Sequence, residues 1–210
     1  MADINTILES LIQGNLEKLQ VDVQAAIDTG LAPGDILNEG LLAGMDIVGS
    51  KMESGEMFIP EVLMSARAMS EALQILKPFL GEDSLNASGK VVFGTVKGDL
   101  HDIGKNLVQM MLESSGFEVI DAGVDVEPEK FIALIKEEKP NIVGLSALLT
   151  TTMGMMQQTV DAIKEAGLRD SVKVIIGGAP VTQEFADQIG ADGYAADAGS
   201  ASRLAKVLMA

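Results

Sequence analysis

Residues 91–106 read VVFGTVKGDLHDIGKN, an apolar run followed by a polar turn and the start of a helical stretch. The run 91–96 is rich in β-branched residues, which favour a buried strand. Small and charged residues over 97–102 interrupt the apolar pattern and predict a turn. A strand that leads through a short turn into a helix is the repeating unit of parallel α/β folds. This stretch therefore decides the fold class of the C-terminal half.

The same alternation of strand and helix continues to the end of the chain. Short apolar runs predict five strands, at 91–96, 118–123, 141–146, 172–178 and 191–196. Helical periodicity predicts helices near 103–115, 128–138, 152–166, 181–189 and 201–209. We therefore predict that residues 88–210 form a Rossmann-like α/β domain with a flavodoxin-like, doubly wound, five-stranded parallel sheet. Its ligand is expected beyond the carboxyl ends of the strands.

The N-terminal half has a different periodicity. Apolar residues recur at helical spacing in four stretches, over 4–12, 16–30, 33–52 and 60–76. Four amphipathic helices predict a small bundle. The polar, turn-prone segment between Pro78 and Gly89 predicts a linker. We therefore predict that residues 1–87 form a four-helix bundle domain with its linker.

Composition fits a folded chain and excludes several kinds of site. The 210 residues are 47% apolar, which supplies ample side chains for a core. The 31 acidic and 15 basic residues give a net charge of -16, which opposes binding to nucleic acids and to anionic membranes. Cysteine is absent and His101 is the single histidine, so thiolate-held clusters and multi-histidine metal sites are excluded. Any metal chemistry is expected to arrive within a cofactor.

Targeting signals are not predicted. The N-terminal residues show no basic segment ahead of an apolar one, and no apolar run approaches the length of a membrane span. We therefore expect a cytoplasmic protein with neither a membrane nor a nucleic-acid partner.

The turn within 94–106 is expected to face the ligand. It contains neither GxGxxG nor GxxxxGK[ST], and Asp99 and Asp102 would repel a pyrophosphate, so a nucleotide site is disfavoured. It does contain Asp-x-His. A neutral imidazole ligates a transition metal through one nitrogen while a nearby carboxylate accepts the proton on the other. A histidine near a helix start is also commonly a capping or packing residue, so the motif alone leaves both interpretations open.

Two further strand ends are predicted to lie beside this turn. Residues 146–152 end the third strand with small hydroxyl side chains, and Gly177 and Gly178 end the fourth. Hydroxyl groups suit a polar ligand, and glycines let a ligand approach the backbone. Each signal is weak alone, because two glycines after a strand are often only a tight turn. Their order and spacing predict a slot for an elongated group.

The motifs that carry a family resemblance are Asp99-x-His101-x-x-Gly104, Ser146-x-Leu148 and Gly177-Gly178. With the helical segment before them, they resemble the corrinoid proteins of methyltransferase systems. They are also similar to the cobalamin-binding module of cobalamin-dependent methionine synthase. The resemblance covers nearly the whole chain, including residues 44–69, which resemble the cap helices of that family.

The resemblance implies that cobalamin or a related corrinoid binds base-off, with its own lower base away from cobalt and its nucleotide tail in the slot. His101 is then the implied lower axial ligand of cobalt and the metal-binding residue. Asp99 is its implied partner, and Thr152 replaces the relay serine of the family, completing the implied catalytic group. Spacing alone leaves Asp102 as a competing carboxylate. The other implied cofactor-binding residues are Gly104, Ser146, Leu148, Thr150, Gly177 and Gly178.

The helical half is implied to cover the upper face of the cofactor. Methionines are concentrated over 45–69, and a packed helix interior is the ordinary explanation for most of them. Phe58 stands where the family places an aromatic cap residue. The resemblance therefore implies that Met57, Phe58 and Val62 form an apolar lid that excludes water and oxygen.

The implied function is a methyl carrier, a subunit that does not act as an enzyme by itself. A substrate-specific methyltransferase would load the cobalt, and a second methyltransferase would pass the methyl group to tetrahydrofolate or coenzyme M. A reductive activase is the third implied partner, because a chain without cysteine holds no reducing cluster of its own. The alternatives are the corrinoid subunit of an adenosylcobalamin-dependent mutase and a cobalamin-dependent sensor. The helical half disfavours the mutase, and the acidic charge disfavours a sensor that reads DNA.

Overall fold

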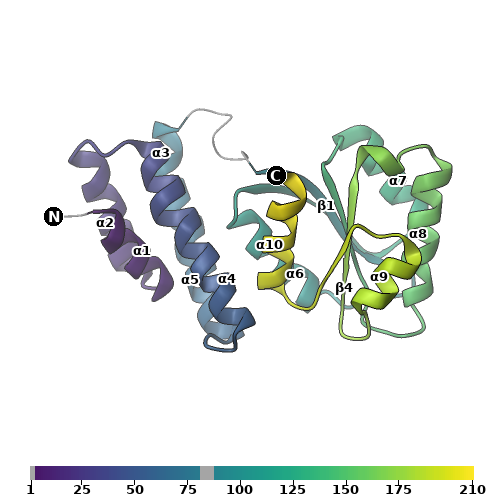
Figure 1. Cartoon of the computed structure of the whole chain (residues 1–210). Coiled ribbons are helices and arrows are strands. Elements are labelled where there is room, and N and C mark those ends of the chain that lie inside the picture. The colour runs from purple at the N-terminus through teal and green to yellow at the C-terminus, as the bar shows by residue number, and fades with distance from the viewer. Residues whose placement is uncertain (1–2, 81–87) are drawn as a thin grey trace. The chain divides into compact units, whose positions relative to one another are not determined.

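Five parallel strands form a single sheet in the C-terminal half of the chain (Figure 1). The computed structural model describes residues 3–80 and 88–210. The strand order is β2-β1-β3-β4-β5, with all neighbours parallel. This is the predicted flavodoxin-like order, and the fold class is confirmed. The strands are β1 (Gly89–Val96), β2 (Phe117–Val126), β3 (Ile142–Ser146), β4 (Lys173–Gly177) and β5 (Gly193–Ala195).

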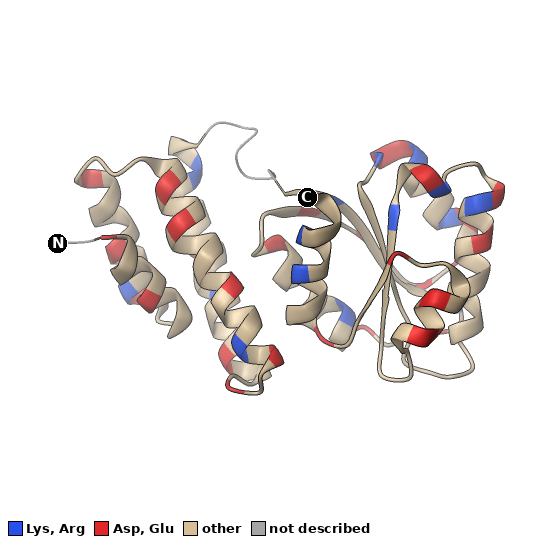
Figure 2. Cartoon of the chain, viewed as in Figure 1, with Lys and Arg blue, Asp and Glu red and all other residues tan. Residues whose placement is uncertain are grey.

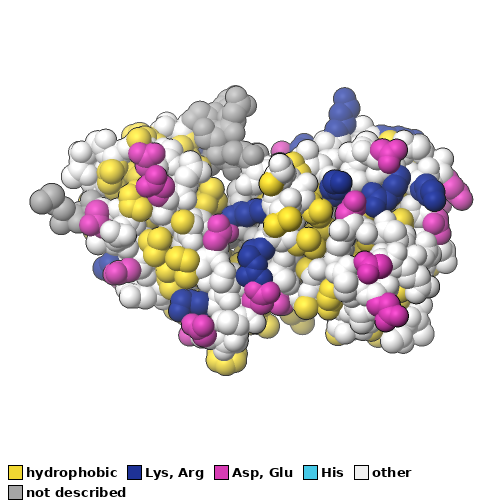
Figure 3. All heavy atoms as spheres, in the orientation of Figure 1, with side chains coloured by type: hydrophobic (Ala, Val, Ile, Leu, Met, Phe, Trp, Pro, Cys, Tyr) yellow, Lys and Arg dark blue, Asp and Glu magenta, His cyan; other side chains and the backbone are white. Residues whose placement is uncertain are grey.

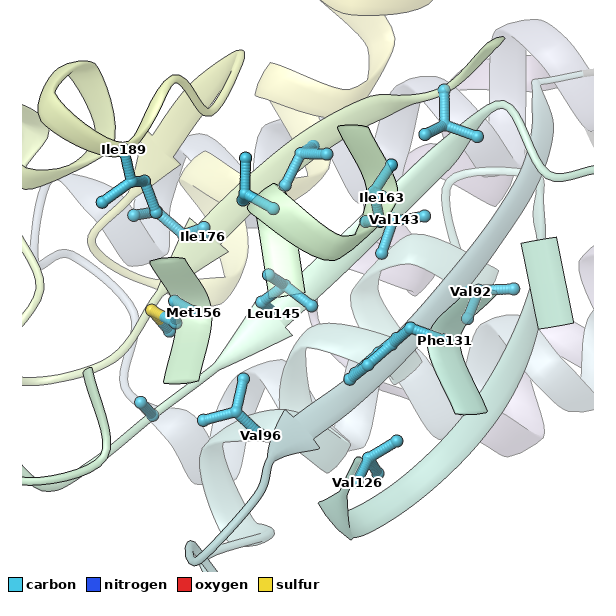
Figure 4. Close-up of a cluster of buried hydrophobic side chains, with 14 of the residues drawn as sticks. Val92, Val96, Val126, Phe131, Val143, Leu145, Met156, Ile163, Ile176 and Ile189 are labelled. Carbon is cyan, nitrogen blue, oxygen red and sulfur yellow. The ribbon is translucent and has the colours of Figure 1, made fainter. Parts of the chain in front are cut away.

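Helices cover both faces of this sheet, with α7 and α8 on one side and α6 and α10 on the other (Figure 1). Side chains alternate along β1, so Val92 packs toward one helical layer and Phe93 toward the other. The larger of the two hydrophobic clusters includes Phe131 and Met156 (Figure 4). The helices are α6 (Ile103–Glu113), α7 (Pro128–Glu138), α8 (Met153–Glu165), α9 (Gln183–Ile189) and α10 (Ala198–Met209), with a 3-10 turn, η4, at Arg169–Ser171.

Several boundaries differ from the prediction, and two of the differences have clear local reasons. Helix α10 begins at Ala198, three residues early, because Asp197 and Ser200 cap it by exchanging backbone and side-chain hydrogen bonds of 2.8 and 3.1 Å. Strand β2 extends to Val126, beyond the predicted end at residue 123. The pairing of β2 with β1 has two irregularities, one between Asp121 and Gly123 and one between Gly123 and Val126. An alternating pattern does not reveal these irregularities, because each adds a residue that breaks the alternation.

The chain divides into two compact units, one over residues 1–87 with 114–116 and the other over the remainder. The first unit, hereafter the helical unit, is helical as predicted, although the linker expected before Gly89 falls mainly on residues 81–87, outside the described part. Acidic side chains are spread along its helices with few basic ones among them (Figure 2). Its elements are α1 (Ile4–Ile12), α2 (Leu16–Asp28), α3 (Pro33–Asp35), η1 (Ile36–Leu42), α4 (Ala43–Glu53), α5 (Ile59–Leu76) and η2 (Lys77–Phe79).

The predicted third helix is a continuous helical run with a π-helical segment, η1, in its middle. Gly44 lies just after this segment, where an added Cβ would come within 2.7 Å of Leu11 of α1. Glycine therefore permits close helix packing here. Apolar spacing did not predict the π turn, because one wide turn shifts the pattern by only a single residue. Of the methionines over 45–69, Met45 and Met69 are buried and Met64 is exposed.

Within the described residues, 3–80 and 88–210, none of the helices combines the length and apolarity needed to cross a membrane.

The packing of β1 against β3 generates a stability prediction. Phe93 and Gly144 are register partners, and a Cβ at Gly144 would overlap the Phe93 ring. We expect Gly144→Ala to lower the free energy of unfolding by about 2 kcal/mol or more in urea denaturation, because the ring has no free space to enter. Gly154→Ala in α8 is the control, since its Cβ would meet no atom within 4 Å. Equal stability of the two variants would refute the packing role.

Candidate functional site

The loop between β1 and α6 lies at the carboxyl edge of the sheet, where β1 is flanked by β2 on one side and β3 on the other. Chain connections leave this point in opposite directions, which is where ligands bind in open α/β sheets. The loop is fixed at its base. Thr95, buried near the end of β1, donates its hydroxyl hydrogen bond to the carbonyl oxygen of His101 at 2.8 Å. The strand therefore sets the position of the imidazole-bearing residue.

Asp99 is fully buried within this loop, and its two carboxylate oxygens accept hydrogen bonds from several segments. Oδ1 accepts from the backbone N–H of His101 at 3.1 Å and faces His101 Nδ1 at 2.6 Å. Oδ2 accepts from the backbone N–H groups of Leu148 at 2.8 Å and Leu149 at 3.3 Å. The Thr152 hydroxyl also donates to Oδ2, at 2.8 Å. The carboxylate is thus surrounded by donors.

These contacts determine the charge of Asp99. Burial raises the pKa of its carboxyl group, but the hydrogen bonds from His101 and Thr152 and from backbone N–H groups outweigh burial. The pKa of Asp99 therefore lies well below its ordinary value. Asp99 is a buried, ionised and fully hydrogen-bonded acceptor at neutral pH.

An ionised carboxylate fixes the tautomer of the imidazole beside it. Because Asp99 Oδ1 can only accept, the 2.6 Å contact requires a proton on Nδ1 of His101. In the neutral ring, Nε2 then carries a free lone pair, which is the form that ligates a transition metal. The His101 side chain is 50% exposed. The pair can therefore offer one metal-binding nitrogen to a ligand outside the protein.

The competing carboxylate does not reach the imidazole. Asp102 is exposed, and its Oδ2 accepts from Asn106 Nδ2 at 3.3 Å. The structure thus brings together Asp99, His101 and Thr152. The Thr152 hydroxyl also lies 2.9 Å from the carbonyl oxygen of Leu149. The Asp99 carboxylate and the Leu149 carbonyl are both acceptors, so the single hydroxyl proton of Thr152 is donated to one of them at a time. The negative charge of the carboxylate favours donation to Asp99.

The surface around His101 is apolar and open. Leu100, which precedes His101, and Ile103, two residues after it, are 72% and 85% exposed, and Leu148 and Leu149 are also exposed. A Cβ added at Gly104 would meet no protein atom within 4 Å. The space at Gly104 is therefore not needed for protein packing. Exposed apolar side chains beside a metal-binding nitrogen suit a broad ligand with an apolar face.

The predicted slot residues are only partly brought together. Ser146 pairs with Gly177 in the register, at the aligned ends of β3 and β4, and Thr150 is exposed in the following turn. Packing within the protein explains why glycine is required at these two positions. A Cβ at Gly178 would collide with the Ala147 carbonyl oxygen. A Cβ at Gly177 would lie 2.9 Å from the carbonyl oxygen of Ala195. Sheet packing therefore accounts for both glycines without a ligand.

The predicted lid residues belong to the helical unit. Phe58 is exposed and Met57 is half-buried just before α5. The Phe58 backbone N–H donates to the Glu61 carboxylate at 2.9 Å, which stabilises the start of the helix. Val62 is fully buried. Its place in the lid stays a prediction.

Lys105 was missed by the sequence reading. Its side chain is almost fully buried, and Nζ donates to Gln109 Oε1 at 2.6 Å and to Asp121 Oδ1 at 2.8 Å. This ion pair joins the first turn of α6 to β2. The Lys105 and Gln109 spacing of four residues was a visible signal for a pair on one helix face. No such signal in the sequence indicated Asp121, because its position near Lys105 depends on strand pairing.

Comparison with known proteins covers both units. The family described as B12 binding domain matches residues 89–202, and a second family of the same description matches residues 3–77. Dimethylamine corrinoid protein 1 of Methanosarcina acetivorans is 48% identical over 181 residues, which are 86% of this chain and 85% of that protein.

Solved structures agree with this family match. A cobalamin-binding protein from Desulfitobacterium hafniense has a TM-score of 0.87 and 35% identity, with 99% of each chain covered. A chain of the methanol:cobalamin methyltransferase complex of Methanosarcina barkeri has a TM-score of 0.83 and 34% identity, covering 98% of this chain and 79% of that one.

The donors around Asp99 generate a prediction for stability and its pH dependence. We expect Asp99→Asn to lower the free energy of unfolding at pH 7 by about 3 kcal/mol, because an amide cannot accept from all the buried donors. The pKa of Asp99 is lower in the folded than in the unfolded protein, so its stabilising effect is present above the unfolded pKa of about 3.9 and is lost as pH falls. The difference between wild type and variant should therefore shrink below about pH 4.

Urea denaturation of the cofactor-free protein from pH 3 to pH 7 measures this difference. Asp102→Asn is the control, because that side chain is exposed and accepts its hydrogen bond from Asn106. It should change stability by less than about 0.5 kcal/mol. A loss for Asp99→Asn that stays constant or grows in acid would contradict the assigned charge state.

Proposed function

Because this chain belongs to the B12-binding family of corrinoid proteins, we propose that it carries a methyl group on a corrinoid held at the carboxyl edge of its sheet. The observation that carries the proposal is the 2.6 Å contact between buried Asp99 and half-exposed His101. It prepares one imidazole nitrogen as a metal ligand. A bound corrinoid supplies cobalt, which can accept and release a methyl group.

The residues of the site fit such a ligand. We propose that His101 Nε2 is the lower axial ligand and that the corrinoid binds base-off. Leu100 and Ile103 offer exposed apolar surface beside His101, and Gly104 leaves open space. Ser146, Leu148 and Thr150 are proposed to contact the nucleotide tail near Gly177 and Gly178.

The proposed work of the protein residues is to set the basicity of the ligand. Asp99 holds the proton on Nδ1, and a stronger hydrogen bond there makes Nε2 a better donor to a metal. Thr152 and the backbone N–H groups of Leu148 and Leu149 share the same carboxylate. Each bond that they make draws negative charge away from His101. The strength of the axial ligand therefore depends on how the carboxylate is shared.

A methyltransferase partner is supported by the likeness to a chain in the methanol:cobalamin methyltransferase complex. We propose that a substrate-specific methyltransferase loads the protein and that a second one passes the methyl group to tetrahydrofolate or coenzyme M. We propose a reductive activase as the third partner protein. Two relatives that match 86% and 85% of this chain are corrinoid proteins named for dimethylamine and trimethylamine. A B12 binding domain family also matches residues 3–77 of the helical unit, which favours the carrier over a mutase subunit or a sensor.

His101→Ala tests the axial ligand. Anaerobically loaded, uniformly 15N-labelled protein with unlabelled cobalamin is reduced to cobalt(II) and examined by electron paramagnetic resonance. Nitrogen from His101 should split the signal into doublets, whereas nitrogen of the cofactor base gives triplets. We expect His101→Ala to lose the doublets, to retain corrinoid, and to transfer methyl at least about tenfold more slowly.

Asp102→Asn should keep both the doublets and the rate, since the Asp102 carboxylate accepts from Asn106 while Asp99 faces the imidazole. Triplets in the wild type would show the cofactor base still on cobalt and would refute base-off binding. Complete loss of corrinoid from His101→Ala would show that ligation, rather than the tail contacts, retains the cofactor.

Phe58→Ala tests the proposed lid. Apolar side chains reach the surface of the helical unit among acidic ones (Figure 3), and Phe58 is 69% exposed. A lid residue of this kind excludes water and oxygen from the bound group. We expect photolysis and air oxidation of the methylated protein to be several-fold faster in Phe58→Ala than in wild type. Absorption spectroscopy measures both rates. Phe79→Ala, which removes another exposed ring of the same unit, should leave these rates unchanged. Unchanged rates in Phe58→Ala would end the lid assignment.

A further inference from the structure

The end of β2 is irregular beside the loop that bears His101. Opposite β1, Phe93 pairs with Asp121, Gly94 with Gly123, and Val96 with Val126. Each step adds one residue to β2 relative to β1, so the strand contains two bulges in succession. Bulges re-aim side chains and are common next to functional sites. Here they turn the final residues of β2 toward the loop after β1.

Asp125 lies in the second bulge and makes two hydrogen bonds to that loop. Its Oδ1 accepts from the backbone N–H of Gly98 at 2.7 Å. Its own backbone N–H donates to the carbonyl oxygen of Asp99 at 3.0 Å. The Gly98–Asp99 dipeptide is therefore held at both ends by a single residue. The carboxylate that faces His101 belongs to this dipeptide.

The backbone of Asp125 is in the left-handed region, with φ of 52°. Few residues other than glycine adopt this conformation, and aspartate and asparagine are the most tolerant. The position therefore requires both a left-handed backbone and a side-chain acceptor. Glycine satisfies the first requirement, alanine satisfies neither, and asparagine satisfies both.

The first bulge is fixed independently. Asp121 Oδ1 accepts from the backbone N–H of Gly123 at 2.8 Å and from buried Lys105 at 2.8 Å. Lys105 lies in the first turn of α6, directly after the loop. Both bulges of β2 are therefore bonded to the segment 98–105, one before and one after His101. The end of β2 holds this segment in place.

We propose that Asp125 is a positioning residue for the Asp99–His101 pair. It acts through the Gly98–Asp99 backbone, and within residues 3–80 and 88–210 its hydrogen bonds reach Gly98 and Asp99 rather than the imidazole. In the loaded protein this role rests on the proposed function, because it concerns the axial ligand. In the cofactor-free protein it concerns only the geometry of the pair.

The test compares Asp125→Gly, Asp125→Asn and wild type by nuclear magnetic resonance of the cofactor-free protein. The chain has one histidine, so its imidazole 15N signals belong to His101 alone. At a pH where the ring is neutral, we expect Asp125→Gly to move the two nitrogen shifts toward each other, as Nδ1–H loses population. The backbone N–H of Leu148 donates to Asp99, and we expect its hydrogen exchange with solvent to become up to about fivefold faster. This factor corresponds to the loss of one hydrogen bond.

Asp125→Asn should restore the wild-type signals, because it keeps the acceptor and tolerates the left-handed backbone. Lys130→Met is the matched control: it removes a 2.7 Å hydrogen bond from Lys130 Nζ to the Ala122 carbonyl of β2 without reaching the loop. It should leave both signals unchanged. Wild-type signals in Asp125→Gly would overturn the proposal, as would an Asp125→Asn variant that behaves like Asp125→Gly or a Lys130→Met variant with equal changes.

A second measurement separates this proposal from the proposed function. In 15N-labelled, cobalt(II)-loaded protein, Asp125→Gly should lose part of the doublet splitting that His101 produces, and Asp125→Asn should keep it. If wild type itself shows no doublets, the axial-ligand proposal fails while the cofactor-free experiment still decides the role of Asp125. If wild type shows doublets and Asp125→Gly keeps them in full, positioning by Asp125 is refuted for the loaded protein.

Discussion

A buried negative charge must be surrounded by donors, and the site is organised around that requirement at Asp99. Burying a carboxylate without partners is so unfavourable that the group would take up a proton instead. Its donors come from the loop after β1, from the turn after β3 and from Thr152. Parallel pairing of β1 with β3 brings these segments to one edge of the sheet. The sheet order is thus what keeps Asp99 ionised.

The ionised carboxylate in turn gives His101 its chemistry. A protonated Asp99 could donate to the ring, and the tautomer would then be undetermined. Because Asp99 only accepts, Nδ1 holds the proton and Nε2 is free at the half-exposed surface. The apolar side chains around it are tolerated at the surface because a ligand covers them in the proposed function. Fold, charge and ligand preference are therefore successive consequences of one arrangement.

Much of this was visible in the sequence, and the remainder has identifiable causes. The strands and the fold class follow from local patterns. Spacing alone did not decide between Asp99 and Asp102 as the partner of His101, and the family resemblance favoured Asp99. Thr152 was found by family resemblance, since 53 residues separate it from Asp99. Lys105 and Asp125 were missed because their partners depend on strand register and on bulges. The full burial of Val62 was not predicted, because the pattern does not tell which face of a helix start is buried.

Thr152 has a second position in the fold, as the residue that immediately precedes α8. The backbone of Thr152 thus continues into a thirteen-residue helix. Its hydroxyl donates a hydrogen bond to the carboxylate that faces the imidazole. A shift of α8 that displaced Thr152 would therefore change the hydrogen bond that this hydroxyl donates to Asp99. A docked macromolecule that pushes on α8 would thereby tune the electron donation of the imidazole from a distance.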